Sequence, residues 1–311
     1  MEKSQEIRSR IKSVSGTRKI TKAMEMIASS KIRKAQNRIL EARVFMAGIE
    51  DVITDIASHS ALLEDPLLVS HEKTGSVLVL GVTADRGLCG GYNSNIVRLI
   101  EKTIKKQRAK SRTVKLFIIG TRGRNYFRYM GYEIDKVYEN LSDYPKFLDA
   151  REISRDIISK YISGEVDKVI ICYTKFKNPA EQIPSGLQLL PIAIDAGIHQ
   201  ADDMQDVPDT PQPIAEEGSR QGVAIEFMYD PSPKEVLGSI LPEYIYTTVY
   251  GTLLESTASE TGARMTAMKS ASENAEDMIK DLVLMYHRAR QQQITLEIAE
   301  IVSGAYALSG D

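Results

Sequence analysis

The sequence has no tryptophan, few aromatic residues (6%) and only two cysteines among its 311 residues. Two cysteines cannot form a disulfide framework or a four-ligand zinc site. The longest stretch without charge, residues 182–194, has 13 residues, whereas crossing a bilayer takes roughly 20. The composition therefore favours a soluble, reduced, intracellular protein built from long helices packed through Ala, Met, Ile and Leu rather than around one thick core. Met1–Ile7 resembles neither a signal peptide nor a presequence, so we expect none.

Charge is nearly balanced overall but not locally. Residues 1–46 carry 12 basic and 4 acidic side chains, a net charge of +8, and residues 195–235 carry 10 acidic and 2 basic side chains, a net charge of −8. The overall balance and the lack of aromatic residues within the basic run Arg8–Arg38 argue against nucleic acid as a partner. An acidic protein partner and a solvated helix face are the alternatives for that run. The acidic segment, with five prolines, is predicted to be an exposed loop.

Residues 1–58 are predicted to form one long coiled-coil helix. Small and apolar residues alternate in steps of four and three, which is the spacing of a coiled-coil seam: Ala28, Ile32, Ala35, Ile39, Ala42, Met46, Ile49, Ile53 and Ile56. Upstream, one group continues a seam (Ile7, Ile11, Val14), and a second group follows in shifted phase (Ile20, Met24, Ile27). The shift predicts a stutter that locally changes the supercoil. Ser15-Gly16 is the weakest helical point.

The C-terminal residues 236–311 are predicted to form a second long helix, with Pro242 at its entry. Its seam again alternates in steps of three and four: Met265, Met268, Ser272, Ala275, Ile279, Leu282, Tyr286 and Ala289. Neither helix can be buried along its whole length by a small domain. We therefore predict that the two helices pair, antiparallel, as an asymmetric shaft.

The middle of the chain has a different pattern. Short β-branched apolar runs at 76–84, 114–120 and 167–176 predict strands, and 188–194 predicts a further one. Amphipathic helices are expected near 94–109 and 150–163. This alternation predicts a small central domain of Rossmann-like α/β type at 75–195, with a parallel sheet, followed by the acidic loop at 196–235. The fold class is thus α/β, combining a long antiparallel coiled coil of the N- and C-terminal helices with a small central parallel-sheet domain.

A glycine-rich turn after the first strand invites a nucleotide-binding interpretation. Its residues are Asp85, Arg86, Gly87, Cys89, Gly90 and Gly91. The spacing is G-x-x-G-G rather than G-x-G-x-x-G, and the chain has no Gly-Lys dipeptide for a Walker loop. The four scattered histidines and the absence of a G-x-S-x-G elbow predict no catalytic or metal site. We therefore expect no cofactor and no enzyme activity of the chain alone. A stand-alone α/β nucleotide-binding protein with coiled-coil arms, or a self-associating scaffold, remains the alternative.

The C-terminal end combines a polar collar with an apolar tip. The collar residues are Arg290, Gln291, Thr295, Glu297 and Glu300, and the tip residues are Ile301, Val302, Ala305, Tyr306, Ala307 and Leu308. A tip that projects past its partner helix requires an apolar socket in another protein, with hydrogen-bonding loops at its mouth.

Three separated motifs resemble the gamma subunit family of F-type ATP synthase. They are residues 294–307 (ITLEIAEIVSGAYA), residues 21–34 (TKAMEMIASSKIRK) and residues 85–91 (DRGLCGG), and the similarity covers nearly the whole chain. The resemblance implies the central rotor shaft, which couples proton-driven rotation of the c-ring to ATP synthesis or hydrolysis at the beta subunits. The implied partners are the alpha and beta subunits, the epsilon subunit and the c-ring, without membrane insertion. The implied location is the cytoplasmic face of a bacterial plasma membrane.

By matching position, the resemblance also implies roles for single residues. Residues implied to contact a beta subunit are Met24, Lys31, Arg33, Lys34, Arg290, Gln291, Thr295, Glu297 and Glu300, and the tip beyond them would be an apolar bearing. The acidic segment departs from the common bacterial form in length. It also lacks the cysteine pair of chloroplast members, so thiol regulation of that type is not expected. A contact with epsilon or the c-ring and a plain solvated loop are the alternatives for this segment.

Overall fold

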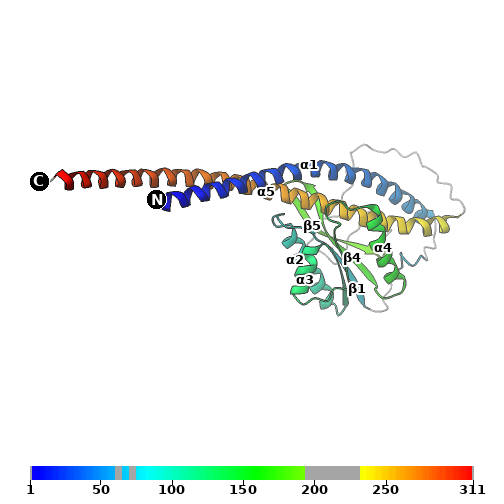
Figure 1. Ribbon diagram of the computed structural model, residues 1–311. Helices are drawn as coiled ribbons and strands as arrows, with labels where there is room; N and C mark the ends of the chain where they lie inside the picture. The colour runs from blue at the N-terminus through cyan, green and yellow to red at the C-terminus, as the bar shows by residue number, and fades with distance from the viewer. Residues whose placement is uncertain (1, 60–64, 70–74, 193–231, 310–311) are drawn as a thin grey trace. The chain divides into compact units, whose positions relative to one another are not determined.

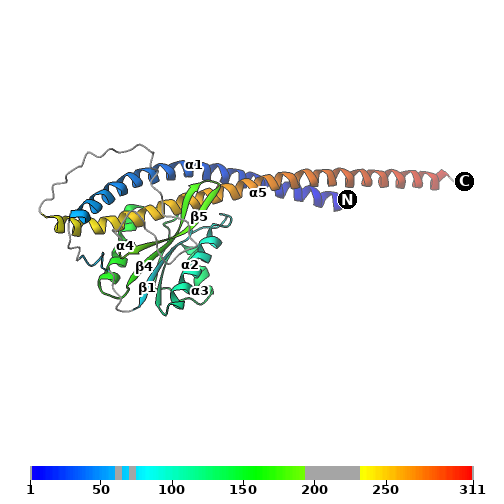
Figure 2. The ribbon, with the colours of Figure 1, turned by 180° about the vertical axis from the view of Figure 1, so that it is seen from behind.

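The computed structural model describes residues 2–59, 65–69, 75–192 and 232–309. In chain order, a long helix precedes and another follows a central run of strands and shorter helices (Figures 1 and 2). In chain order the elements are α1 (Glu2–His59), β1 (Ser76–Val82), α2 (Tyr92–Ala109), β2 (Thr113–Ile119), α3 (Thr121–Tyr129), β3 (Lys136–Tyr138), α4 (Phe147–Ile162), β4 (Lys168–Asn178), β5 (Glu181–Leu190) and α5 (Pro233–Ser309). The chain divides into two compact units, one of Met1–Ser29 with Arg264–Asp311, and the other of Ser30–Ala263.

The first unit is a two-stranded antiparallel coil of the start of α1 and the end of α5. The Ser4 hydroxyl donates to Gln293 Oε1 at 3.1 Å, and Arg18 Nη1 lies 3.6 Å from Glu276 Oε2. The residue numbers of the two helices therefore run in opposite directions along the coil, as they do in an antiparallel pair. The predicted seam of α5 is confirmed, since its members are buried or half-buried while their neighbours on the outer face are exposed.

The predicted stutter in α1 is wrong. Ile20 and Ile27 are 63% and 59% exposed, whereas Thr21 is 8% exposed and Ala28 is buried. Buried and half-buried residues instead follow one unbroken alternation of four and three through the first unit, at positions 7, 11, 14, 18, 21, 25 and 28. A small polar residue takes the seam position because the heptad geometry, not residue hydrophobicity, decides which face meets the partner helix. The helix also runs without interruption through Ser15-Gly16.

The second unit contains a five-stranded sheet with the order β3-β2-β1-β4-β5. The first four strands of this order pair in parallel, as the sequence predicts, and β5 pairs antiparallel with β4. The fifth strand begins at Glu181 rather than at the expected residue 188, so it follows β4 directly as a hairpin. Asn178 shapes that hairpin, because its Oδ1 accepts the backbone N–H groups of Ala180 and Glu181.

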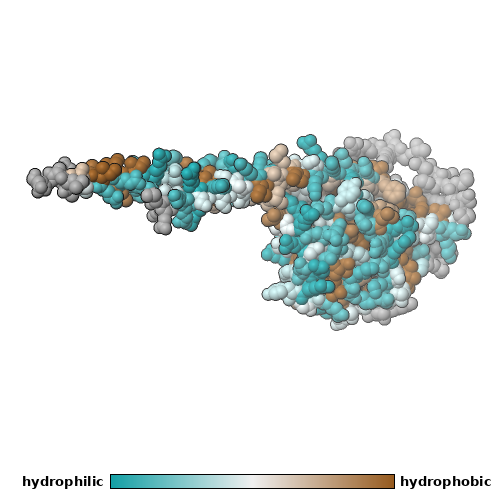
Figure 3. Space-filling model, viewed as in Figure 1, coloured by the Kyte–Doolittle hydropathy of each residue, from teal (hydrophilic) through white to brown (hydrophobic). Residues whose placement is uncertain are grey.

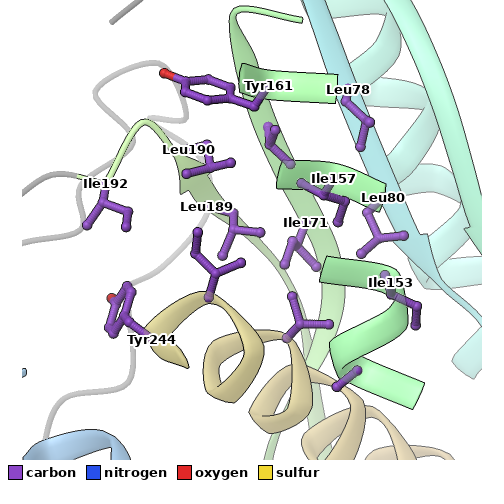
Figure 4. Packing of buried hydrophobic residues seen from close by; sticks show 14 of the residues in the cluster. Leu78, Leu80, Ile153, Ile157, Tyr161, Ile171, Leu189, Leu190, Ile192 and Tyr244 are labelled. Carbon is purple, nitrogen blue, oxygen red and sulfur yellow. The ribbon is translucent and has the colours of Figure 1, made fainter. Parts of the chain in front are cut away.

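Each face of the sheet has its own core. On one face, alternate residues of β1 such as Val77 and Val79 pack with α2 and with Phe127 of α3. On the other face, Leu78 and Leu80 pack with α4, with α5 and with Ile53 of α1 (Figure 4). This alternation is the period of two expected of a strand that is covered on both sides.

The base of the long helices belongs to this second core. The seam residues Ile32, Ala35, Ile39 and Ile53 of α1 are buried, as predicted, and Ile56 lies among side chains that the structure does not describe. Helix α5 begins at Pro233, upstream of the expected entry at Pro242. The Ser232 hydroxyl accepts the backbone N–H of Glu235 at 3.3 Å, so Ser-Pro-Lys-Glu is a capping sequence with proline at the first helical position. Pro242 is tolerated inside the helix between buried Leu241 and Tyr244.

Candidate functional site

Asp85 ties together the loops that follow the first three parallel strands. Its Oδ1 accepts hydrogen bonds from the backbone N–H and the hydroxyl of Thr121, at 3.0 and 3.1 Å. Its Oδ2 accepts the backbone N–H of Ser142 at 3.1 Å, and the Ser142 hydroxyl in turn accepts the Asp85 N–H. Burial raises the pKa of Asp85, but the N–H groups of Ser142, Thr121 and Asn140 outweigh it, so the pKa lies below its ordinary value. The carboxylate is therefore held charged as a structural link.

The glycines of this turn allow a tight return of the chain into α2. Gly90 has a φ of +55°, and a Cβ on Gly87 would lie 2.7 Å from Arg122 Nη2. Cys89 is buried and accepts a hydrogen bond from Asn93 Nδ2 at 3.2 Å, while Asn93 Oδ1 accepts the Ala84 N–H. The turn is thus closed by its own side chains.

This arrangement does not favour a nucleotide phosphate. The first N–H of α3, which could bind an anion, already binds the Asp85 carboxylate, and a second negative group would be repelled there. Among the residues that the structure describes, no group of His, Cys, Asp and Glu side chains could hold a metal ion. The central-domain motif of the sequence is therefore best explained as a structural link between loops.

The basic residues of α1 fall into two kinds. Lys31 Nζ lies 2.9 Å from Asp143 Oδ1, and the exposed Arg86 lies 3.7 Å from Asp143 Oδ2, so Asp143 joins α1 to the glycine turn. Arg33 and Lys34 are exposed on the same helix, and Met24 of the first unit is half-buried. Arg33 and Lys34 form no ion pair with the other described residues.

Arg38 has a role that the sequence did not reveal. It lies at the end of the basic run, but its Nη2 donates to the carbonyl of Pro145 at 2.5 Å and to the hydroxyl of Tyr250 at 2.8 Å. Its guanidinium also covers the ring of Tyr144, with 4.2 Å to the centroid. It therefore clamps the loop before α4 between α1 and α5. No signal in the local sequence distinguishes it from its exposed neighbours.

The end of α5 extends past its partner helix within the first unit. Gln293 is level with Ser4, so about 14 residues of α5, or roughly 20 Å, lie beyond the first described residues of α1. The collar residues Arg290, Gln291, Thr295, Glu297 and Glu300 are all exposed, as the sequence predicts for an outward-facing set.

The end of α5 carries an apolar stripe. Four of its exposed apolar side chains follow the helical spacing i, i+4, i+7, i+8, namely Ile294, Ile298, Ile301 and Val302, whereas Leu296, also exposed, lies on the opposite face. They form a hydrophobic patch near the end of the helix (Figure 3). Ala305 is exposed too, and the side chains of Tyr306 and Leu308 lie outside the described residues. Among the described residues no helix covers this stripe, and exposed apolar stripes of this kind are typical of protein–protein contact surfaces.

The described helices include no stretch that is both long and apolar enough to pass through a membrane. Fold and surfaces together define a class of protein: an assembly subunit in which a long coil carries an unpartnered apolar end.

Comparisons with known proteins give the family. The family model described as ATP synthase matches residues 3–308. An ATP synthase gamma chain of Desulforamulus reducens is 40% identical over 308 residues, which cover 99% of this chain and 100% of the relative. One of Chlorobium phaeobacteroides is 35% identical over 309 residues and 98% of each chain. The chain therefore belongs to the ATP synthase gamma chain family.

Solved structures agree at the level of the fold. A chain from the rotor of the Euglena gracilis mitochondrial ATP synthase superposes with a TM-score of 0.60 and 15% identity, covering 94% of this chain and 99% of that one. A chain from the central stalk and c-ring of the Tetrahymena thermophila enzyme gives a TM-score of 0.57 at 23% identity, covering 81% and 99%. At these identities the likeness concerns the fold alone.

Proposed function

We propose that the chain is the central rotor shaft of an F-type ATP synthase. The observation that carries the proposal is the end of α5, which leaves its partner helix and presents Ile294, Ile298, Ile301 and Val302 to solvent. Such a stripe is stabilised only when an apolar socket removes it from water. The ring of alpha and beta subunits supplies this socket, and Ile301, Val302, Ala305, Tyr306 and Leu308 form the bearing.

The polar residues around the coil contact the beta subunits. The collar of Arg290, Gln291, Thr295, Glu297 and Glu300 lies where the tip enters the socket, and its exposure suits hydrogen bonds to loops at the socket's mouth. Met24, Arg33 and Lys34 contact beta on the α1 side. Lys31 belongs to the same set, and within this chain it pairs with Asp143.

Coupling follows from the asymmetry of the coil. Each orientation offers a different set of contacts to the three beta subunits, and a conformation that gains contacts is favoured at that orientation. Proton flow turns the c-ring, and the shaft turns with it. In this proposal residues 1–58 and 236–311 form the shaft, and residues 75–195 form the domain that meets the c-ring and epsilon. The acidic segment 196–235 lies almost entirely outside the described residues.

The chain itself catalyses nothing and binds no nucleotide. The Asp85 carboxylate supports this, because a fixed negative charge at the first residue of the glycine turn disfavours a phosphate there. Chemistry takes place on the ring, and the complex sits at the cytoplasmic face of a bacterial plasma membrane, held there through the c-ring.

The test is isolation of the complex through a tag on this chain. We expect one copy with three copies each of two larger nucleotide-binding subunits, and ATPase activity in the complex but not in the chain alone. In membrane vesicles, Arg290→Ala/Gln291→Ala should lower ATP synthesis several-fold. Arg288→Ala/Gln292→Ala removes the same residue types from exposed positions of the same helix and should leave synthesis near wild type. A homo-oligomer, or ATPase activity of the isolated chain, would overturn the proposal.

A further inference from the structure

Helix α5 carries an unusual set of buried polar residues where it crosses the sheet of the second unit. Each of them is at most 9% exposed: Thr247, Thr248, Thr252, Glu255, Ser256, Thr257, Ser259, Glu260 and Thr261. The buried face of α4, against the same side of the sheet, is mainly apolar. Burying polar groups costs free energy unless they find partners, so the partners of these residues show what the stretch holds together.

Two of these residues bind the backbone of β4. The Ser259 hydroxyl donates to the carbonyl of Thr174 at 3.0 Å, and the Thr174 N–H donates to Ser256 Oγ at 3.5 Å. The pairing of β1 with β4 ends at Cys172, two residues earlier. The N–H and C=O of one strand residue point to the same edge. The serines of α5 therefore complete the strand edge that β1 leaves open.

An ion pair joins α1 to the same point. Arg43 Nη2 lies 3.1 Å from Glu255 Oε1, and the Glu255 side chain is 9% exposed. Burial raises the pKa of Glu255, with Arg43 and Lys175 of β4 opposing this rise. Burial, and to a lesser degree the charge of Glu255, also raises the pKa of Tyr173 of β4. Three elements far apart in sequence thus meet within five residues of α5, from Glu255 to Ser259.

Directed contacts resist a displacement that apolar contacts permit. Hydrophobic packing is non-directional, so a helix that turns or slides slightly on a sheet keeps most of its buried area. A hydrogen bond or a charge-assisted pair weakens steeply with angle and distance. The serine bonds fix α5 on β4, and the ion pair fixes α1 on α5.

We propose that Arg43, Glu255, Ser256 and Ser259, with the backbone of Thr174, form a torsional lock. The lock holds the parts of α1 and α5 that lie in the second unit on the sheet of the α/β domain. Resting on the proposed rotor function, the lock makes the coil turn with the domain under load. These are positioning residues, because they act through contacts with each other and with the backbone of β4. Loss of the lock lets part of each turn be dissipated as slip.

The experiment uses the assembled ATP synthase in membrane vesicles. Two readouts are taken, the rate of ATP hydrolysis and the rate of ATP-driven proton uptake, and their ratio measures coupling. In Ser256→Ala/Ser259→Ala we expect hydrolysis to persist while protons moved per ATP fall about twofold or more, because both bonds to β4 are lost together.

The matched control is Thr252→Val/Thr257→Val. These threonines are as buried, but their hydroxyls bond carbonyls of α5 itself, at Val249 and Leu253. Their loss cuts no bond between helix and sheet, so the ratio should stay at the wild-type value. A general loss of stability would lower assembly in both variants and leave the ratio of the assembled complexes unchanged.

A second variant guards against misfolding. Arg43→Met/Glu255→Met replaces the pair by apolar residues of similar size, a change that stability usually tolerates. This double variant should assemble normally and lower the ratio. Of the two single variants, Arg43→Lys should keep a ratio closer to wild type than Arg43→Met, because lysine keeps the positive charge. A wild-type ratio in both lock variants would overturn the lock. A wild-type complex that pumps protons satisfies the rotor function regardless, so the two proposals fail separately.

Discussion

Replacing Asp85 by alanine tests whether the glycine turn is a structural link between loops. The change removes a half-buried carboxylate that accepts three hydrogen bonds of 3.0–3.1 Å, two from Thr121 and one from Ser142. A hydrogen bond to a charged group contributes about 1.5–3 kcal/mol, and the three act on one group and are not additive. We therefore expect Asp85→Ala to lower the free energy of unfolding of the second unit by about 2–4 kcal/mol.

The assay is urea unfolding of the purified chain, followed by tyrosine fluorescence, with hydrogen exchange of the Thr121 and Ser142 amides as a local readout. Both amides should lose protection in the variant. Arg86→Ala is the matched control, because Arg86 is the next residue and is exposed, and its side chain forms a 3.7 Å ion pair with Asp143 among the described residues. Its effect should stay under about 0.5 kcal/mol.

The effect of Asp85 should also depend on pH in a defined direction. Its pKa is lower in the folded chain than in the unfolded chain, so its contribution to stability is present above the unfolded value of about 4. The contribution is lost as the pH falls through the lowered pKa, and the difference between wild type and Asp85→Ala should shrink over that range. A difference below about 0.5 kcal/mol at neutral pH, or one that grows on acidification, would refute the reasoning.

Three further predictions concern other parts of the chain. Gly120→Ala should lower the free energy of unfolding by more than about 3 kcal/mol, since φ is +97° and a Cβ would lie 2.3 Å from the Thr83 carbonyl oxygen; Gly131→Ala, at φ +74° in open space, should cost about 1–2 kcal/mol in the same urea titration. The cysteine thiols should react slowly with an aromatic disulfide reagent at pH 8 and quickly in guanidinium, because both are buried and burial raises the pKa of Cys172 to about 12; equal rates would contradict this. Ala28→Gln should destabilise the coil by about 1–3 kcal/mol and Ile27→Gln by under about 0.5 kcal/mol, as measured by thermal unfolding followed by circular dichroism. A larger effect at Ile27 than at Ala28 would instead support the predicted stutter.

The coil could be predicted well because its signal is periodic and local. The seam from Ala28 to Ile53 and the seam of α5 are read directly from the spacing of small and apolar residues. The phase error upstream came from following hydrophobicity at Ile20 and Ile27, where continuity of the heptad pointed to Thr21. Single exposed isoleucines are ordinary on a protein surface, so the hydrophobicity of one residue does not assign the face of a helix.

In the central domain, local sequence patterns do not predict contacts between residues that are distant in the sequence. The need for glycine in the turn was visible, but the partners of Asp85 lie 36 and 57 residues further along the chain. Arg38 and Arg43 read as ordinary members of a basic helix face, and only the packing of α5 and the loop before α4 gives them partners. Two elements, α3 and β3, were missed because α3 is short and rich in arginine and β3 has only three residues.

The unpartnered end of α5 has a consequence for how the chain behaves before assembly. A helical extension of about 14 residues that packs against no other element is marginal in water, because it buries little apolar area and frays from its free end. The amides between Thr295 and Ala305 should therefore exchange with solvent far faster than those of the paired coil. Entry into an apolar socket would then order these turns and bury their apolar stripe in the same step. Part of the binding free energy would therefore be used to fold the helix. Exchange at these few amides would report, in a mixed population, what fraction of the chains has found its complex.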